Sequence, residues 1–177
     1  MSLKTFIAGA GMAACLATGP ATAQTSAPAA NPLLAPWSGP YGGVPPFDQA
    51  KVEHLKPALE AGMAENLAEV DRIASNPQPA TFENTIAALE RTGRTLDRVG
   101  TIYGIYASTL NDEAVQAVER EMEPKLAAFN DQITQNEALF KRIAAVYEAR
   151  EKSGLTPEQQ RLTWLYYTNF VRAGAKL

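Results

Sequence analysis

Histidine and cysteine are nearly absent from this sequence of 177 residues, which contains one of each, His54 and Cys15. A zinc site takes three or four ligands from His, Cys, Asp and Glu, and the helical His-Glu-x-x-His motif needs two histidines. A Ser-His-Asp triad needs an activated serine, and the serines nearest to His54, Ser38 and Ser75, lie in no nucleophile-elbow motif. The sequence therefore predicts no catalytic and no metal-binding residue within this chain, and His54 is expected on a helix surface or between helices.

Long runs of one charge are also missing. The chain has 16 basic and 19 acidic residues, a net charge of −3 at pH 7, and no stretch rich in lysine and arginine. Proteins that bind nucleic acid usually carry such a basic patch, so no nucleic-acid partner is expected. With 46% hydrophobic and 20% charged residues, the composition is typical of a globular domain rather than a disordered chain.

Candidate acid–base residues are few. Glu119 and Glu123 share one helix face at a spacing of four residues, with Glu121 between them. Because no third ligand or apolar pocket accompanies them in the sequence, they are interpreted as a solvated helix face. Four tyrosines at helical spacing are predicted to pack in the core rather than to bind a ligand: Tyr103, Tyr106, Tyr166 and Tyr167.

The first 23 residues are predicted to be a signal peptide. Lys4 supplies a positive start, an apolar stretch rich in small residues follows, and Ala21 and Ala23 suit the two small-residue pockets of a signal peptidase. Cleavage after Ala23 would leave Gln24 as the first residue and would remove the only cysteine. The apolar stretch is too short to cross a bilayer. The expected location is periplasmic or secreted, and a lipoprotein signal ending at Cys15 is the alternative.

Proline shapes the next segment. Residues 24–30 read as a flexible linker, and residues 31–47 as an extended arm in which large apolar side chains alternate with prolines. A linker has no need of such side chains, so the arm is predicted to dock on a larger body. Its large apolar residues are Leu33, Leu34, Trp37, Tyr41, Val44 and Phe47.

From residue 48 to residue 177 the apolar residues recur at steps of three and four. This spacing predicts an all-α fold of about five antiparallel helices and no sheet. Thr81 and Asn136 are expected to begin helices as N-caps, and Thr156 opens a capping box with proline next to it.

Three glycines lie inside the apolar pattern that follows Thr81 and ends near Leu110. Gly93, Gly100 and Gly104 are predicted to let a neighbouring helix pack closely, and Gly93 could instead mark a kink.

Several short strings, in order and at the right spacing, resemble the M3 family of zinc metallopeptidases, and within it the peptidyl-dipeptidase Dcp branch. The resemblance extends over nearly all of residues 31–177. The strings are Asn31-Pro32-Leu33-Leu34, Tyr41-Gly42-Gly43-Val44-Pro45-Pro46-Phe47-Asp48, Pro57-Ala58-Leu59-Glu60-Ala61-Gly62-Met63, Thr81-Phe82-Glu83-Asn84-Thr85-Ile86 and Phe170-Val171-Arg172-Ala173-Gly174-Ala175.

The resemblance implies that the chain is the N-terminal part of a longer periplasmic exopeptidase that releases dipeptides from the C-termini of peptide substrates. It implies an incomplete helical lobe that forms one wall of a substrate channel, with zinc bound by residues beyond Leu177. The segment itself is then expected to bind no zinc and to be inactive alone. Two alternatives remain: an oligopeptidase A-like endopeptidase of the same family, and a non-catalytic periplasmic helical binding module.

Overall fold

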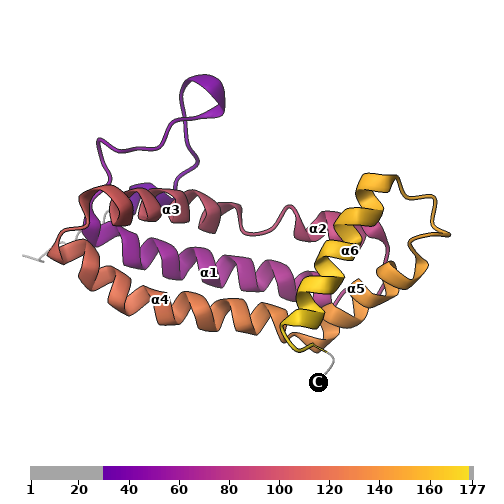
Figure 1. Cartoon of the computed structure of the whole chain (residues 1–177). Helices are drawn as coiled ribbons and strands as arrows, with labels where there is room; N and C mark the ends of the chain where they lie inside the picture. The colour runs from indigo at the N-terminus through magenta and orange to yellow at the C-terminus, as the bar shows by residue number, and fades with distance from the viewer. Residues whose placement is uncertain (1–29, 176–177) are drawn as a thin grey trace, which may run out of the picture.

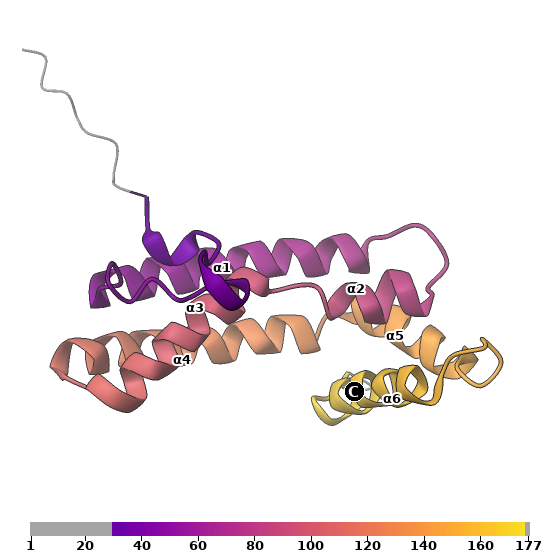
Figure 2. The ribbon, with the colours of Figure 1, turned by 90° about the horizontal axis from the view of Figure 1, so that it is seen from above.

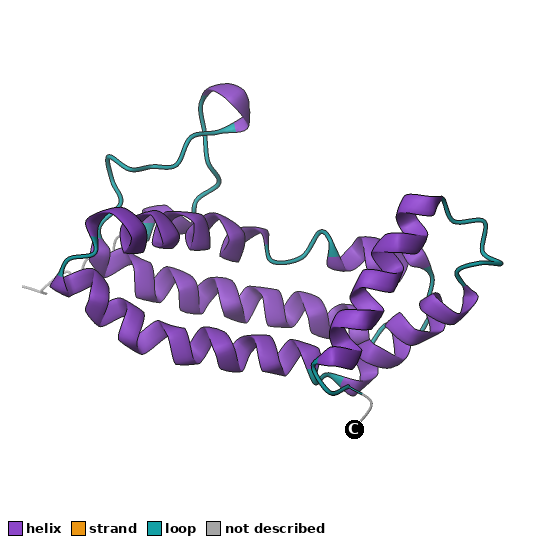
Figure 3. Cartoon of the chain, viewed as in Figure 1, coloured by secondary structure: helices purple, strands orange, loops and turns teal. Residues whose placement is uncertain are grey.

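A computed structural model gives the structure of the chain for residues 30–175. Within that range five helices have 12 residues or more, and Figure 3 shows helices joined by loops. The described residues contain one isolated β-bridge, between Ser38 and Val44. The predicted all-α class is confirmed. In chain order the helices are α1 (Val52–Ala74), α2 (Ala87–Leu89), α3 (Arg94–Ile105), α4 (Glu113–Thr134), α5 (Glu137–Ala149) and α6 (Pro157–Arg172) (Figure 1).

The predicted signal peptide, its cleavage residues Ala21, Ala23 and Gln24, the alternative lipid-attachment residue Cys15, and nearly all of the predicted linker lie outside the described residues. None of the helices in residues 30–175 combines the length and apolar content that crossing a bilayer requires.

The helices form a long layer with a pair of packed helices, α5 and α6, at one end. Helices α1, α3 and α4 pack together, and α3 runs opposite to the other two (Figures 1 and 2). Helices α5 and α6 pack against each other beside α2 and the π-helical turn Phe82–Ile86 that precedes it. The helical region begins at Val52 rather than at residue 48, because residues 45–50 make tight turns instead.

Two clusters of buried side chains hold this arrangement, and α1 contributes to both. The first cluster lies among α1, α3 and α4, and includes Leu55, Leu59, Met63, Val99, Ile102, Val115 and Met122. The second lies where the end of α1 meets α2, α5 and α6, and includes Val70, Ile73, Ile86, Leu89, Leu139, Ile143 and Phe170. Tyr103 and Tyr106 are buried in the first cluster, and Tyr166 and Tyr167 pack against the second, which agrees with their predicted core role.

The helix starts predicted from local sequence are confirmed. The Thr81 hydroxyl accepts a hydrogen bond from the Asn84 backbone N–H at 3.1 Å, and the Asn136 side chain caps α5 through the Leu139 N–H at 2.9 Å. Thr156 forms the predicted capping box of α6 with Gln159. Each cap satisfies a backbone donor that the first helical turn leaves without a partner.

The apolar pattern that follows Thr81 does not form one helix. Gly93 takes a left-handed conformation with φ of 74°, and α3 begins after it. The Gly93 N–H donates to Glu69 Oε2 at 2.7 Å, and a Cβ at this position would lie 2.7 Å from Asn66 Nδ2. The chain therefore turns where glycine is required both for backbone conformation and for contact with α1.

The prediction that Gly100 and Gly104 permit close helix packing is wrong. A Cβ built at either position would meet nothing within 4 Å. The close approach of α1 and α3 occurs at Gly62, where a Cβ would lie 3.0 Å from Leu96 Cα.

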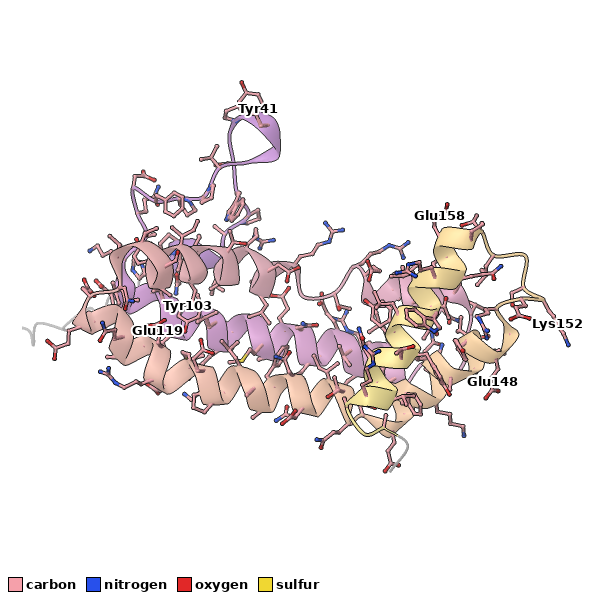
Figure 4. The ribbon with its side chains drawn as sticks, in the orientation of Figure 1. Tyr41, Tyr103, Glu119, Glu148, Lys152 and Glu158 are labelled. Carbon is pink, nitrogen blue, oxygen red and sulfur yellow. The ribbon has the colours of Figure 1, made fainter. Side chains whose placement is uncertain are left out.

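The arm lies partly against this chain's own helices. Asn31 Nδ2 donates to the His54 carbonyl at 2.8 Å, Leu33 is completely buried, and Trp37 packs against the first cluster. Beyond Trp37 the arm leaves the helices, and Tyr41 is exposed at its tip (Figure 4).

Candidate functional site

His54 lies in the first turn of α1 and helps to cap it. Its Nδ1 accepts a hydrogen bond from the Lys51 backbone N–H at 3.3 Å, which places it on the helix surface, as expected. Within residues 30–175 no three His, Cys, Asp or Glu side chains come together in a way that could hold a metal ion. These residues therefore do not fit the zinc ion that the family resemblance implies for the whole enzyme, and no chemical step is assigned to them.

The carboxylates of α4 contact α3 as well as solvent. The Tyr103 hydroxyl, on a side chain that is almost buried, donates to Glu123 Oε1 at 2.8 Å, and Glu119 lies nearby (Figure 4). Burial is the largest cause that raises the pKa of Tyr103, followed by the hydrogen bond to Glu123 and by the negative charges of Glu123 and Glu119. A phenol with a raised pKa stays protonated at neutral pH, so this pair joins two helices rather than transferring protons.

The raised pKa of Tyr103 predicts a specific loss of stability at alkaline pH. An unfolded tyrosine ionises near a pKa of about 10, so the contribution of Tyr103 is complete below that pH and is lost as the pH rises through the higher folded pKa. In urea unfolding between about pH 9 and pH 11, the Tyr103→Phe variant should lose stability less steeply than the wild type. A Tyr41→Phe control, altered at an exposed ring, should follow the wild type. Parallel curves for Tyr103→Phe and the wild type would contradict the assignment.

A network of charged side chains links α1 to α4. Glu121 accepts hydrogen bonds from Lys56 and, at 3.2 Å, from Lys125, whose Nζ also lies 2.5 Å from Glu60 Oε1. The two lysines hold the pKa of Glu121 below its usual range, and Glu60 and Glu121 raise the pKa of Lys125. Because all four side chains are partly exposed, the network contributes little stability and helps fix the relative position of the two helices.

Arg142 is a buried cation that sequence analysis did not identify. Its Nη1 donates to the carbonyls of Asn76 and Gln78 at 2.8 and 2.9 Å, and its Nη2 donates to Asn84 Oδ1 at 2.9 Å and to Thr85 Oγ1 at 3.3 Å. Only 8% of the residue is exposed, and the four acceptors are uncharged. The guanidinium thus fixes the loop after α1 and the turn before α2 to α5. The sequence does carry one indication of this burial, because Arg142 lies on the apolar face of α5 with Leu139, Ile143 and Val146.

One cavity is lined by polar groups that already have hydrogen-bond partners. It has a volume of about 310 Å³ and lies between the α5–α6 connection and the Thr81 turn. Of its polar lining, Ser153 Oγ donates to the Ala149 carbonyl at 2.6 Å, and Gln159 Oε1 accepts from the Thr156 N–H at 3.0 Å. This cavity therefore offers no convergent set of polar groups for a ligand.

Exposed apolar side chains are a more distinctive feature of the surface. They occur on the arm, at the end of α3 and its continuation, and on α6: Tyr41, Val44, Phe47, Ile105, Leu110, Trp164 and Leu165. Scattered exposed apolar residues are ordinary, but a cluster on one protruding segment often marks an interaction site. The arm carries such a cluster.

Comparison with known proteins identifies relatives of this chain. Over 147 residues, which are 83% of the chain, it is 38% identical to a dipeptidyl carboxypeptidase of Escherichia coli K12 and 35% identical to one of Salmonella typhimurium. The chain is a homologue of the dipeptidyl carboxypeptidases. The predicted resemblance to that branch of the M3 family is confirmed. No family model matches the chain.

The similarity covers a small part of each relative. The matched residues make up 21% of the Escherichia coli protein and 22% of the Salmonella protein, so the chain spans about a fifth of the length of these relatives. Oligopeptidase A of Escherichia coli is more distant, with 24% identity over 131 residues, which are 74% of the chain and 18% of that protein.

Proposed function

We propose that this chain is the N-terminal part of a periplasmic zinc peptidyl-dipeptidase that releases dipeptides from the C-termini of peptides. The observation that carries the proposal is the difference in identity between the two kinds of relative. The chain is 35–38% identical to dipeptidyl carboxypeptidases and 24% identical to oligopeptidase A of Escherichia coli. The periplasmic location rests on the sequence of residues 1–23.

In this proposal the described helices have a steric role. The α1, α3 and α4 layer would form one wall of the substrate channel and restrict access to unfolded peptides. Two observations support a steric rather than a chemical role for these helices. No metal-binding group forms within residues 30–175. Among the titratable pairs there, Tyr103–Glu123 and Glu121 with its two lysines join helices to each other. Zinc, held elsewhere in the parent protein, would supply the activated water for hydrolysis.

A pair of peptides tests the proposal. The parent reading frame, continued beyond Leu177, should release a C-terminal dipeptide from a peptide with a free carboxylate, and should leave the same peptide with an amidated C-terminus intact. Product release is followed by mass spectrometry. Chelator should abolish it and added zinc should restore it, whereas the 177-residue chain should be inactive in every condition.

The alternatives give different results in the same assay. Internal cleavage of the amidated peptide would indicate the oligopeptidase A-like endopeptidase. Peptide binding without turnover in any form of the protein would indicate the non-catalytic module. Zinc-dependent turnover by the 177-residue chain alone would show that the active site had been placed in the wrong part of the protein.

A further inference from the structure

Residues 38–44 form a small hairpin within the arm. The Val44 N–H donates to the Ser38 carbonyl at 3.0 Å, and the Gly43 N–H donates to the Pro40 carbonyl at 3.1 Å. Between them the chain makes a 3₁₀ turn, with Tyr41 at the tip. The hairpin projects away from the helix layer, and the side chain of Tyr41 points outward (Figures 1 and 4).

Glycine and tryptophan shape the base of this hairpin. Gly39 and Gly43 have φ angles of 106° and 120°, which other residues rarely adopt. A Cβ on Gly43 would lie 2.7 Å from Trp37 Cβ and 2.9 Å from the Trp37 backbone, so only glycine fits beside it. Since Trp37 packs against the first core cluster, the hairpin is attached to the helices through its base.

Neither the backbone conformation nor the packing within this chain explains why residue 41 is a tyrosine. Its φ of 58° places a residue with a Cβ in the left-handed region, which is unfavourable for residues other than glycine, asparagine and aspartate. Its exposure is 102%, so the ring gains no packing in return. Two further apolar side chains of the arm, Val44 and Phe47, are also exposed, at 49% and 45%. The segment therefore presents an aromatic and apolar surface outward on a hairpin with an anchored base.

We propose that this hairpin is a docking element, and that the Tyr41 ring inserts into an apolar pocket on the remainder of the parent peptidase. This inference rests on the proposed function. The docking partner is inferred from the length of the relatives. About four fifths of the chain of the relatives at 35–38% identity lies outside the matched region. Tyrosine suits such a contact, since its ring buries apolar area while its hydroxyl finds a polar partner.

Chemical footprinting of tyrosine compares the two forms of the protein directly. In the 177-residue chain, nitration followed by mass spectrometry should modify Tyr41 readily and the buried Tyr103 and Tyr106 slowly. In the parent protein the rate at Tyr41 should fall by about tenfold or more, because a docked ring is withdrawn from the reagent. The rates at Tyr103 and Tyr106 should stay low in both forms, which controls for unfolding.

Two variants separate docking from folding. In the 177-residue chain, Tyr41→Gly should not lower the melting temperature, since the ring makes no contact and glycine tolerates the backbone conformation. In the parent, Tyr41→Gly should lower the melting temperature and speed proteolysis between the arm and the rest, whereas Tyr41→Phe should retain most of the wild-type behaviour. Equal nitration of Tyr41 in both forms, or no effect of Tyr41→Gly in the parent, would overturn the inference.

Other occupants give distinct results. Protection of Tyr41 in the 177-residue chain by added peptide would make the ring a substrate contact, and protection that increases with chain concentration would make it a self-association site. Either result overturns docking on the parent. Failure of the proposed function is seen separately, as a wild-type parent that releases no dipeptide, whatever the nitration rate of Tyr41. A reading frame that stops at Leu177 would overturn both proposals.

Discussion

Replacement of Arg142 by methionine should destabilise the fold by about 2–4 kcal/mol, because several buried hydrogen bonds to a charged donor are lost together. Methionine keeps much of the aliphatic volume of arginine, so the effect reports on the guanidinium rather than on a cavity. The acceptors that lose their donor include the Gln78 carbonyl and Thr85 Oγ1, and Thr85 is completely buried. Urea unfolding followed by far-ultraviolet circular dichroism measures the change.

The matched control for this substitution is Lys141→Met. Lys141 precedes Arg142 on α5 and is exposed, so the same change of side chain there should alter stability by less than about 0.5 kcal/mol. Equal effects of the two substitutions would show that the Arg142 hydrogen bonds do not hold the loop after α1 and the turn before α2 in place.

Truncation of Leu33 to alanine should cost about 2–4 kcal/mol, as is typical for a completely buried leucine in a well-packed site. Leu33 belongs to the arm but packs in the first core cluster, so the arm should also become more sensitive to proteolysis near Trp37. Thermal unfolding and limited proteolysis measure the two effects.

Val44→Ala is the control in the same arm. Val44 is 49% exposed, and its truncation should change stability by less than about 0.5 kcal/mol. If Leu33→Ala behaves like Val44→Ala in both measurements, the first part of the arm does not contribute to the folded core.

Features that depend on neighbouring residues in the sequence could be predicted from it. Thr81, Asn136 and Thr156 cap helices because each side chain reaches a backbone N–H within the next few residues, and the residue type and position are enough to indicate this. The all-α class follows in the same way from apolar spacing.

Features that depend on distant partners could not be predicted in this way. Arg142 is buried because its acceptors lie 57 to 66 residues earlier in the chain, and the periodicity of α5 does not show them. Gly93 turns the chain because of Asn66 and Glu69 on α1, whereas Gly100, in the same apolar pattern, faces open space.

The same distinction between near and distant residues applies to the candidate site. The absence of a metal centre, expected from the scarcity of histidine and cysteine, stays a prediction. The exposure of Tyr41 could be found only from the structure. Its left-handed conformation depends on the turn between Gly39 and Gly43, and its position depends on the packing of Trp37. Family resemblance was available from ordered strings, and the relatives confirm it.

The continuity of α1 also has a consequence for how the molecule loses its structure. Leu55 and Leu59 near one end belong to the first cluster, and Val70 and Ile73 near the other belong to the second. Because a helix propagates more easily than it nucleates, fraying that begins in either cluster is opposed by the intact half of the same helix. This single element therefore couples the two ends into one cooperative unit, so a substitution that weakens one cluster should also destabilise the other.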